Sequence, residues 1–131
     1  MAKQKKKLTL EDLIALKEKP LTTTAEVYVP ALGGTITIQR GSLMDYQRAI
    51  DAINSASSTE ERVRATFEAI YTFCPILHDP NLHIVYGTDQ EGCVPPDIVP
   101  RVFREDAGSI SAVFNGILEL YGDGVRTEVK N

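Results

Sequence analysis

The densest run of prolines lies in the second half of the chain. Five of the seven prolines fall between Pro75 and Pro100. A proline inside a helix removes a hydrogen bond and clashes with the preceding turn, so no long helix is expected to pass through this stretch. The same stretch holds both cysteines and both histidines. It can be interpreted as a series of short helices packed on longer ones, or as a cluster of metal ligands.

Length and charge limit the class of protein. A chain of 131 residues favours a single domain, and 43% hydrophobic with 24% charged residues is ordinary for a globular protein. The net charge is −4, but four lysines within the first seven residues leave −8 on the rest. A basic head on an acidic body argues against a nucleic-acid-binding face.

Targeting signals are not expected from the sequence. Glu11 and Asp12 interrupt the apolar segment after the basic head, so it does not form the core of a secretion signal. No apolar run approaches the length of a membrane span. Two cysteines without a secretion signal indicate free thiols in a reducing cytoplasm. The sequence therefore predicts a soluble intracellular protein that binds neither membrane nor nucleic acid.

The clearest strand signal lies near the N-terminus. Apolar and polar side chains alternate on both sides of Pro30–Gly34, whose two adjacent glycines suit a turn. This pattern predicts one β-hairpin over about residues 25–39. A two-stranded hairpin alone is marginal in water. We therefore expect helices or another strand to cover its Val and Ile face.

Caps, apolar stripes and helix breakers predict the other elements. The expected helices are a short one after the Thr9–Asp12 capping box and before Pro20, one capped by Ser42 and Asp45, one from Thr59 to Pro75, one from Pro80 to Tyr86 closed by Gly87, one opened by Pro96 and Asp97, and a last one capped by Ser109 and stopped by Gly122 and Gly124. The predicted fold class is α+β, a mainly helical single domain with one N-terminal hairpin. Its expected limits are a basic flexible N-terminus (1–8), a globular domain (9–122) and a flexible C-terminal tail (123–131).

Four side chains of the proline-dense stretch are candidate metal ligands: Cys74, His78, His83 and Cys93. Zinc takes four nitrogen or sulfur donors, so the number is right. The spacing lacks the paired Cys-x2-Cys knuckle, and Cys74 falls on the apolar face of its predicted helix, where cysteine usually acts as a small hydrophobe. The alternative is two core or interface thiols and two surface histidines. We therefore expect no metal and no cofactor.

Catalytic motifs are not evident. The chain has no Gly-x-Ser-x-Gly, and no Gly-Lys-Ser or Gly-Lys-Thr follows Gly33–Gly34. Pro75 breaks the helix that would place Cys74 and His78 on one face, which disfavours a cysteine nucleophile. The acidic pairs Glu11–Asp12 and Glu60–Glu61 fit the first turns of helices. We therefore expect a protein that is not an enzyme.

An apolar stripe on the last predicted helix is wide enough to serve either the core or a partner. The default is a place in the core, and the alternative is a groove for an amphipathic helix. The candidate partner-binding residues are Phe103, Ile110, Phe114, Ile117, Leu118, Leu120 and Tyr121.

Six segments, in their order along the chain, carry a resemblance to a known family: Leu8–Ile14, Val27–Ile38, Tyr71–Pro75, Tyr86–Gly87, Pro96–Val99 and the terminal helix through Leu120–Gly122. They resemble the tail assembly chaperones of long-tailed phages and prophages, specifically the XkdN-like group. The resemblance implies a non-enzymatic factor that binds the long, helical tape-measure protein before the tail tube polymerises around it. Such a factor acts in the host cytoplasm and is absent from the finished virion.

The resemblance also implies further contacts. Many members are made in a longer, frameshifted form whose extension contacts tail tube subunits. The hairpin edges could add a strand to a tube subunit or to another copy of the chain. Two other classes stay open: a structural tail or head–tail connector subunit, and a small metal-stabilised adaptor.

Overall fold

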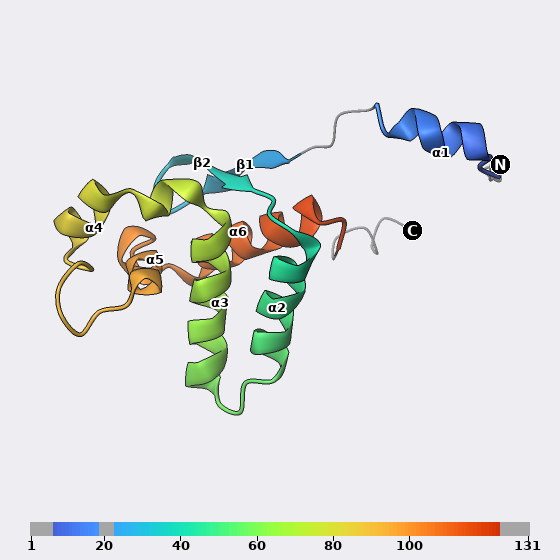
Figure 1. Cartoon of the computed structure of the whole chain (residues 1–131). Helices are drawn as coiled ribbons and strands as arrows, with labels where there is room; N and C mark the ends of the chain where they lie inside the picture. The colour runs from blue at the N-terminus through green and yellow to red at the C-terminus, as the bar shows by residue number, and fades with distance from the viewer. Residues whose placement is uncertain (1–6, 19–22, 124–131) are drawn as a thin grey trace.

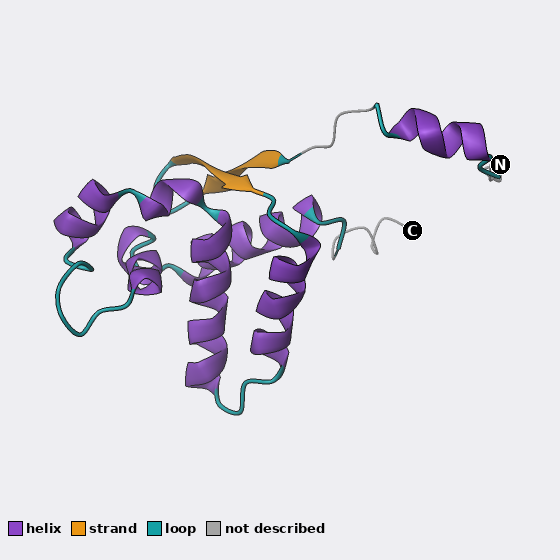
Figure 2. Cartoon of the chain, in the orientation of Figure 1, coloured by secondary structure: helices purple, strands orange, loops and turns teal. Residues whose placement is uncertain are grey.

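The last helix lies at the centre of this computed structural model, which describes residues 7–18 and 23–123 (Figure 1). Within these ranges the elements are, in order, α1 (Leu10–Leu16), β1 (Thr24–Val29), β2 (Gly34–Gln39), α2 (Leu43–Asn54), α3 (Thr59–Phe73), the 3₁₀ helix η1 (Pro75–His78), α4 (Pro80–Tyr86), the 3₁₀ helix η2 (Pro95–Asp97), α5 (Ile98–Val102) and α6 (Ala107–Leu120). Figure 2 shows a mainly helical molecule with one short hairpin. The predicted α+β fold class is confirmed.

The two strands form the expected antiparallel hairpin, with Thr24 opposite Gln39 and Val29 opposite Gly34. One face is apolar, and its Val29 and Ile38 are fully buried. On the other face, Glu26 accepts hydrogen bonds from two threonines of β2, at 3.0 and 2.7 Å. The alternation of apolar and polar residues thus separates a buried face from a solvated one.

The buried face of the hairpin packs on α6, which also contacts α3. Gly116 makes this approach possible, because a Cβ atom at that position would lie 2.5 Å from Cγ2 of Val27. Val113 and Ile117 of α6 point into the shared core with Phe73 and Ile70 of α3. A helix covered by a sheet on one side and by helices on another needs apolar residues on more than one face.

Helices α2 and α3 pack side by side as an antiparallel pair (Figure 1). Ser42 caps α2 as predicted, by accepting from the backbone N–H of Asp45, and Ser58 caps α3 by accepting from that of Glu61. Helix α3 ends at Phe73, and Pro75 begins η1 after the C-cap residue Cys74. The joined ends of the two helices extend past α6 in Figure 1.

The proline-dense stretch folds into short helices. Asp79 caps α4 by accepting from the Asn81 N–H at 2.8 Å, and Gly87 ends the helix with a φ of +75°. Both features were predicted from the Asp-Pro pair and the glycine. The 3₁₀ helices η1 and η2 were not predicted, because each is too short for a hydrophobic period to distinguish it from a turn.

The N-cap of the last helix differs from the prediction. Asp106 caps α6, and Ser109 lies inside the first turn, where it is buried. The Asp106 carboxylate accepts from both the N–H and the hydroxyl of Ser109, at 3.0 and 2.6 Å. The Ser109 hydroxyl in turn accepts from the Ala31 N–H at 2.9 Å. The serine is therefore used to attach the hairpin turn to α6, which leaves the capping role to the aspartate.

Several predictions concern residues that the structure does not describe. The flexible head (1–8) and tail (123–131) lie largely outside the described ranges, as do Pro20 and Gly124 at two expected helix ends. Among the residues that are described, no helix is long and apolar enough to cross a membrane.

Candidate partner-binding groove

Cys74 is a core residue at the C-terminal end of α3. It is fully buried, and burial raises the pKa of its thiol to about 12. His78, four residues later, stacks on the ring of Tyr71 at 4.1 Å. Its Nε2 lies 2.7 Å from the Tyr71 carbonyl oxygen, which can only accept, so Nε2 carries the proton. These two candidate ligands thus have separate structural contacts.

His83 and Cys93 are also held by the protein itself. Nε2 of His83 donates to the Leu77 carbonyl at 2.7 Å, and Nδ1 lies 2.6 Å from the hydroxyl of the buried Thr88. Both ring nitrogens are therefore engaged, and they join η1 to the loop after α4. The Cys93 sulfur lies 3.7 Å from a guanidinium nitrogen of Arg101.

The four candidate ligands do not form a shared centre. Across residues 7–18 and 23–123, no three side chains of His, Cys, Asp or Glu are grouped as metal ligands would be. These side chains instead make contacts within the chain that hold the short helices of the proline-dense stretch in place.

Two of the candidate partner-binding residues are inaccessible. The side chains of Phe103 and Ile117 are buried in the core, which corrects the suggestion that a partner contacts them. The physical reason is the central position of α6: its wide stripe is shared between the hairpin and α3. Sequence spacing shows which residues are apolar but not which side of the stripe is covered.

Tyr121, a third candidate, anchors the end of α6. Its hydroxyl accepts from the Gly41 N–H at 2.7 Å and donates to the Ser42 carbonyl at 3.2 Å. Its ring stacks on Tyr46 at 4.3 Å, and the guanidinium of Arg40 lies over it at 4.9 Å. Leu120 is half-buried beside it, and its carbonyl accepts from Arg40 at 3.3 Å. This cluster ties the helix to the β2–α2 connection.

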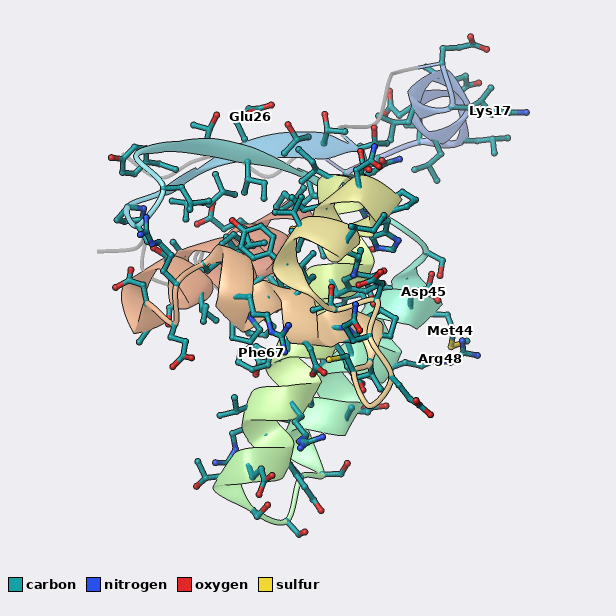
Figure 3. The ribbon with its side chains drawn as sticks, turned by 90° about the vertical axis from the view of Figure 1, so that its left-hand side faces the viewer. Lys17, Glu26, Met44, Asp45, Arg48 and Phe67 are labelled. Carbon is teal, nitrogen blue, oxygen red and sulfur yellow. The ribbon has the colours of Figure 1, made fainter. Side chains whose placement is uncertain are left out.

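The other three candidates line an open surface. Ile110, Phe114 and Leu118 are spaced by four residues on α6, and all are half-buried. Two hollows follow this row. The larger, about 520 Å³, has Ile110 on one side and Val63 and Phe67 of α3 on the other. Figure 3 places Phe67 where α3 emerges beside α5 and α6.

The second hollow, about 290 Å³, continues the row toward the end of α6. Phe114 and Leu118 form one side, and Ile50 and Ile53 of α2 form the other. The two hollows share no lining residue, but their walls opposite α6 belong to α3 and α2, which pack together. We refer to them jointly as the α6 groove, formed by Ile50, Ile53, Val63, Phe67, Ile110, Phe114 and Leu118.

Acidic groups lie at both ends of the α6 groove. Glu105 lines the hollow beside Ile110, and Asp123 lines the hollow beside Leu118. The Asp123 carboxylate accepts a 2.6 Å hydrogen bond from Tyr46. Burial, followed by this carboxylate, raises the pKa of the Tyr46 hydroxyl, so the tyrosine stays protonated and keeps the bond.

Unusual backbone conformations flank the groove. Arg104 and Glu105 have φ values of 58° and 54°, in the left-handed region that side chains disfavour. Two such residues in succession reverse the chain between α5 and α6. They also place Glu105 at the rim of the groove.

Sequence reasoning identified the α6 wall of the groove but not the opposite wall. Val63 and Phe67 are not among the candidate partner-binding residues expected from the sequence. Val63 is in fact 42% exposed. A signal for this exposure lies in the length of the helices: α3 has 15 residues, and the elements packed against it are shorter.

Comparisons with known proteins returned no match among protein-family models, curated proteins or solved structures.

Proposed function

We propose that this chain is a non-enzymatic assembly chaperone that holds an amphipathic helical segment of a tape-measure protein while a phage-type tail assembles in the host cytoplasm. The proposal joins the resemblance of the sequence to tail assembly chaperones with one structural observation. That observation is the α6 groove, an open apolar surface bounded by three helices.

The shape and chemistry of the groove suit a helical ligand. Ile110, Phe114 and Leu118 lie in one row on α6, and the apolar residues of α2 and α3 face this row across the two hollows. An amphipathic helix places apolar residues at positions i, i+3, i+4 and i+7, which can fill such a row of hollows. Tape-measure helices have apolar stripes of this kind, and covering them prevents aggregation before the tube forms.

The acidic body supports the same role. The net charge of −4 keeps a protein with an apolar groove soluble. Carboxylates at both ends of the groove favour ligand helices that have lysine or arginine beside their apolar stripe.

Co-expression with the neighbouring tape-measure protein tests this proposal. We expect the tape-measure protein to be soluble only when this chain is present, and the two to elute together in size-exclusion chromatography. A tape-measure protein that stays soluble alone, or that elutes separately, contradicts the chaperone role. Mass spectrometry of assembled particles provides the second readout, because a chaperone is absent from them and a structural subunit is retained.

A further inference from the structure

Helix α1 has an apolar face that the rest of the described chain does not cover. Leu10, Leu13 and Ile14 lie at positions i, i+3 and i+4 and are 70%, 54% and 61% exposed. None of the residues of α1 is buried, and Figure 1 shows the helix apart from the other elements. A group of exposed large apolar side chains is typical of an interaction site.

The helical form of α1 is encoded locally. The Thr9 hydroxyl accepts from the Asp12 N–H at 3.2 Å, and the Asp12 carboxylate accepts from the Thr9 N–H at 2.9 Å. This reciprocal capping box satisfies two backbone donors of the first turn. The helix is therefore specified by its own residues, while its apolar face has no partner within the described chain.

The α6 groove matches α1 in length. Seven helical residues extend about 10 Å, and Ile110 and Leu118 are eight residue steps apart, about 12 Å. The three apolar side chains of α1 therefore suit a groove with three apolar residues along one wall.

The N-terminal segment that contains α1, rather than the helix itself with its Glu11 and Asp12, carries the charge opposite to that of the groove ends. The first 19 residues contain six lysines and three acidic residues, a formal charge of +3, whereas the remaining residues carry −7. Lys7 and Lys17 flank α1, and Glu105 and Asp123 lie at the two ends of the groove. Opposite charges at the rim of an apolar contact favour encounter and discriminate against other partners.

We propose that α1 of a second copy of this chain occupies the α6 groove, and that two copies exchange their α1 helices in a two-fold dimer. Exchange of a terminal element is a low-cost route to dimers, because each copy supplies the same helix and the same groove. Occupation by the second copy is favoured because α1 leaves the groove of its own chain open. The dimer rests on the proposed function only because both use the α6 groove. In the dimer, α1 covers this groove until a helix of the tape-measure protein displaces it.

Single substitutions at exposed positions test the dimer by sedimentation of the full chain over a range of concentrations. Leu13→Glu alters α1, and Val63→Glu alters the groove. Val85→Glu on α4, 77% exposed, is the matched control. We expect the wild type and Val85→Glu to dimerise equally. Leu13→Glu and Val63→Glu each weaken dimerisation by at least tenfold, with unchanged melting temperatures of the monomer.

Mixing the two weakened variants distinguishes helix exchange from other dimers. The Val63→Glu chain retains an intact α1, and the Leu13→Glu chain retains an intact groove. One of the two exchanged contacts can therefore form between them, and we expect a mixed dimer that is tighter than either variant with itself. Separate pairing of α1 with α1 and of groove with groove gives no mixed dimer.

Three results overturn this inference: a wild type that is monomeric at all concentrations, a dimer insensitive to either substitution, and the absence of the mixed dimer. The tape-measure protein takes no part in these measurements. Co-elution with that protein can therefore succeed while the exchange dimer fails, or the reverse.

Discussion

At the scale of single residues, the two cysteines occupy contrasting environments. Cys74 is fully buried at the end of α3, and burial raises the pKa of its thiol to about 12. Cys93 is partly exposed in the loop before η2, with Arg101 beside its sulfur. The thiolate is the reactive form, so burial protects Cys74 twice, by exclusion of the reagent and by retention of the proton.

A thiol reagent such as DTNB at pH 8 tests this contrast. We expect one fast-reacting thiol in the native protein and two after unfolding in guanidinium chloride. Cys93→Ser removes the fast reaction and leaves the second thiol to appear on unfolding. A native protein in which both thiols react quickly contradicts the buried position of Cys74.

The hydrogen bond from Tyr46 to Asp123 predicts a loss of stability at alkaline pH. Burial and the Asp123 carboxylate raise the pKa of Tyr46 above the value of about 10 that it has in the unfolded chain. The folded state therefore binds the Tyr46 proton more tightly than the unfolded chain does. The contribution of this group to the free energy of unfolding is complete below pH 10 and declines as the pH rises past 10.

Tyr46→Phe is expected to lower the free energy of unfolding by about 1 kcal/mol at pH 7, the usual net value of one hydrogen bond. The substitution should also make the decline of the free energy of unfolding above pH 10 shallower. Part of this decline remains, because burial also raises the pKa of Tyr71 and Tyr121. Tyr28→Phe on the exposed face of β1 is the control. Urea unfolding between pH 7 and 11 measures both effects, and an unchanged pH profile for Tyr46→Phe would falsify this account.

At the scale of elements, the contact between α6 and β1 depends on Gly116. Alanine normally stabilises a helix interior by up to about 1 kcal/mol relative to glycine. At position 116 its Cβ would lie 2.5 Å from Cγ2 of Val27, a stiff β-branched side chain. The steric cost, typically about 1–3 kcal/mol for overpacking, should exceed the helical gain.

Gly116→Ala is therefore expected to destabilise the protein, and Gly108→Ala is its matched control in the same helix. The nearest atom to a Cβ at position 108 is a carboxylate oxygen of Asp106 at 3.8 Å, an ordinary contact. We expect Gly108→Ala to be neutral or slightly stabilising. Thermal unfolding of the two variants measures the difference, and a stable Gly116→Ala would show that α6 does not approach β1 this closely.

Local signals explain why most elements were predictable. The hairpin follows from alternation around two glycines, and α2, α3 and α4 follow from Ser42, Thr59 and the Asp79–Pro80 pair, because caps and prolines act within one helical turn. The start of α6 was placed at Ser109 because serine and aspartate both cap helices. Only the distant N–H of Ala31 shows that the serine is used elsewhere.

The candidate site was less predictable, because it depends on which elements cover which side chains. Phe103 and Phe114 have the same chemistry in the sequence, yet one is buried and the other lines the α6 groove. Ile110, Phe114 and Leu118 were named correctly as apolar residues of α6. The facing residues of α2 and α3 were missed, because their exposure depends on the relative lengths of packed helices and not on a pattern within either helix.

At the scale of the whole molecule, the proline-dense stretch and the groove belong to one arrangement. Short helices after Pro75 return the chain to α3, and the two left-handed residues before α6 direct it across the domain. Helix α6 then packs between the hairpin and α3, while the far ends of α2 and α3 remain beside its open edge. The stretch that first indicated metal chemistry thus helps to position the α6 groove.

The most direct test of the central claim is whether the α6 groove binds the tape-measure protein. Val63→Glu places a charge in the larger hollow, and Val85→Glu places the same charge on α4. Co-purification with the tape-measure protein, followed by titration of the purified components, compares the two variants. We predict at least tenfold weaker binding by Val63→Glu, about 1.4 kcal/mol, and unchanged binding by Val85→Glu. Equal binding by both variants would contradict the account.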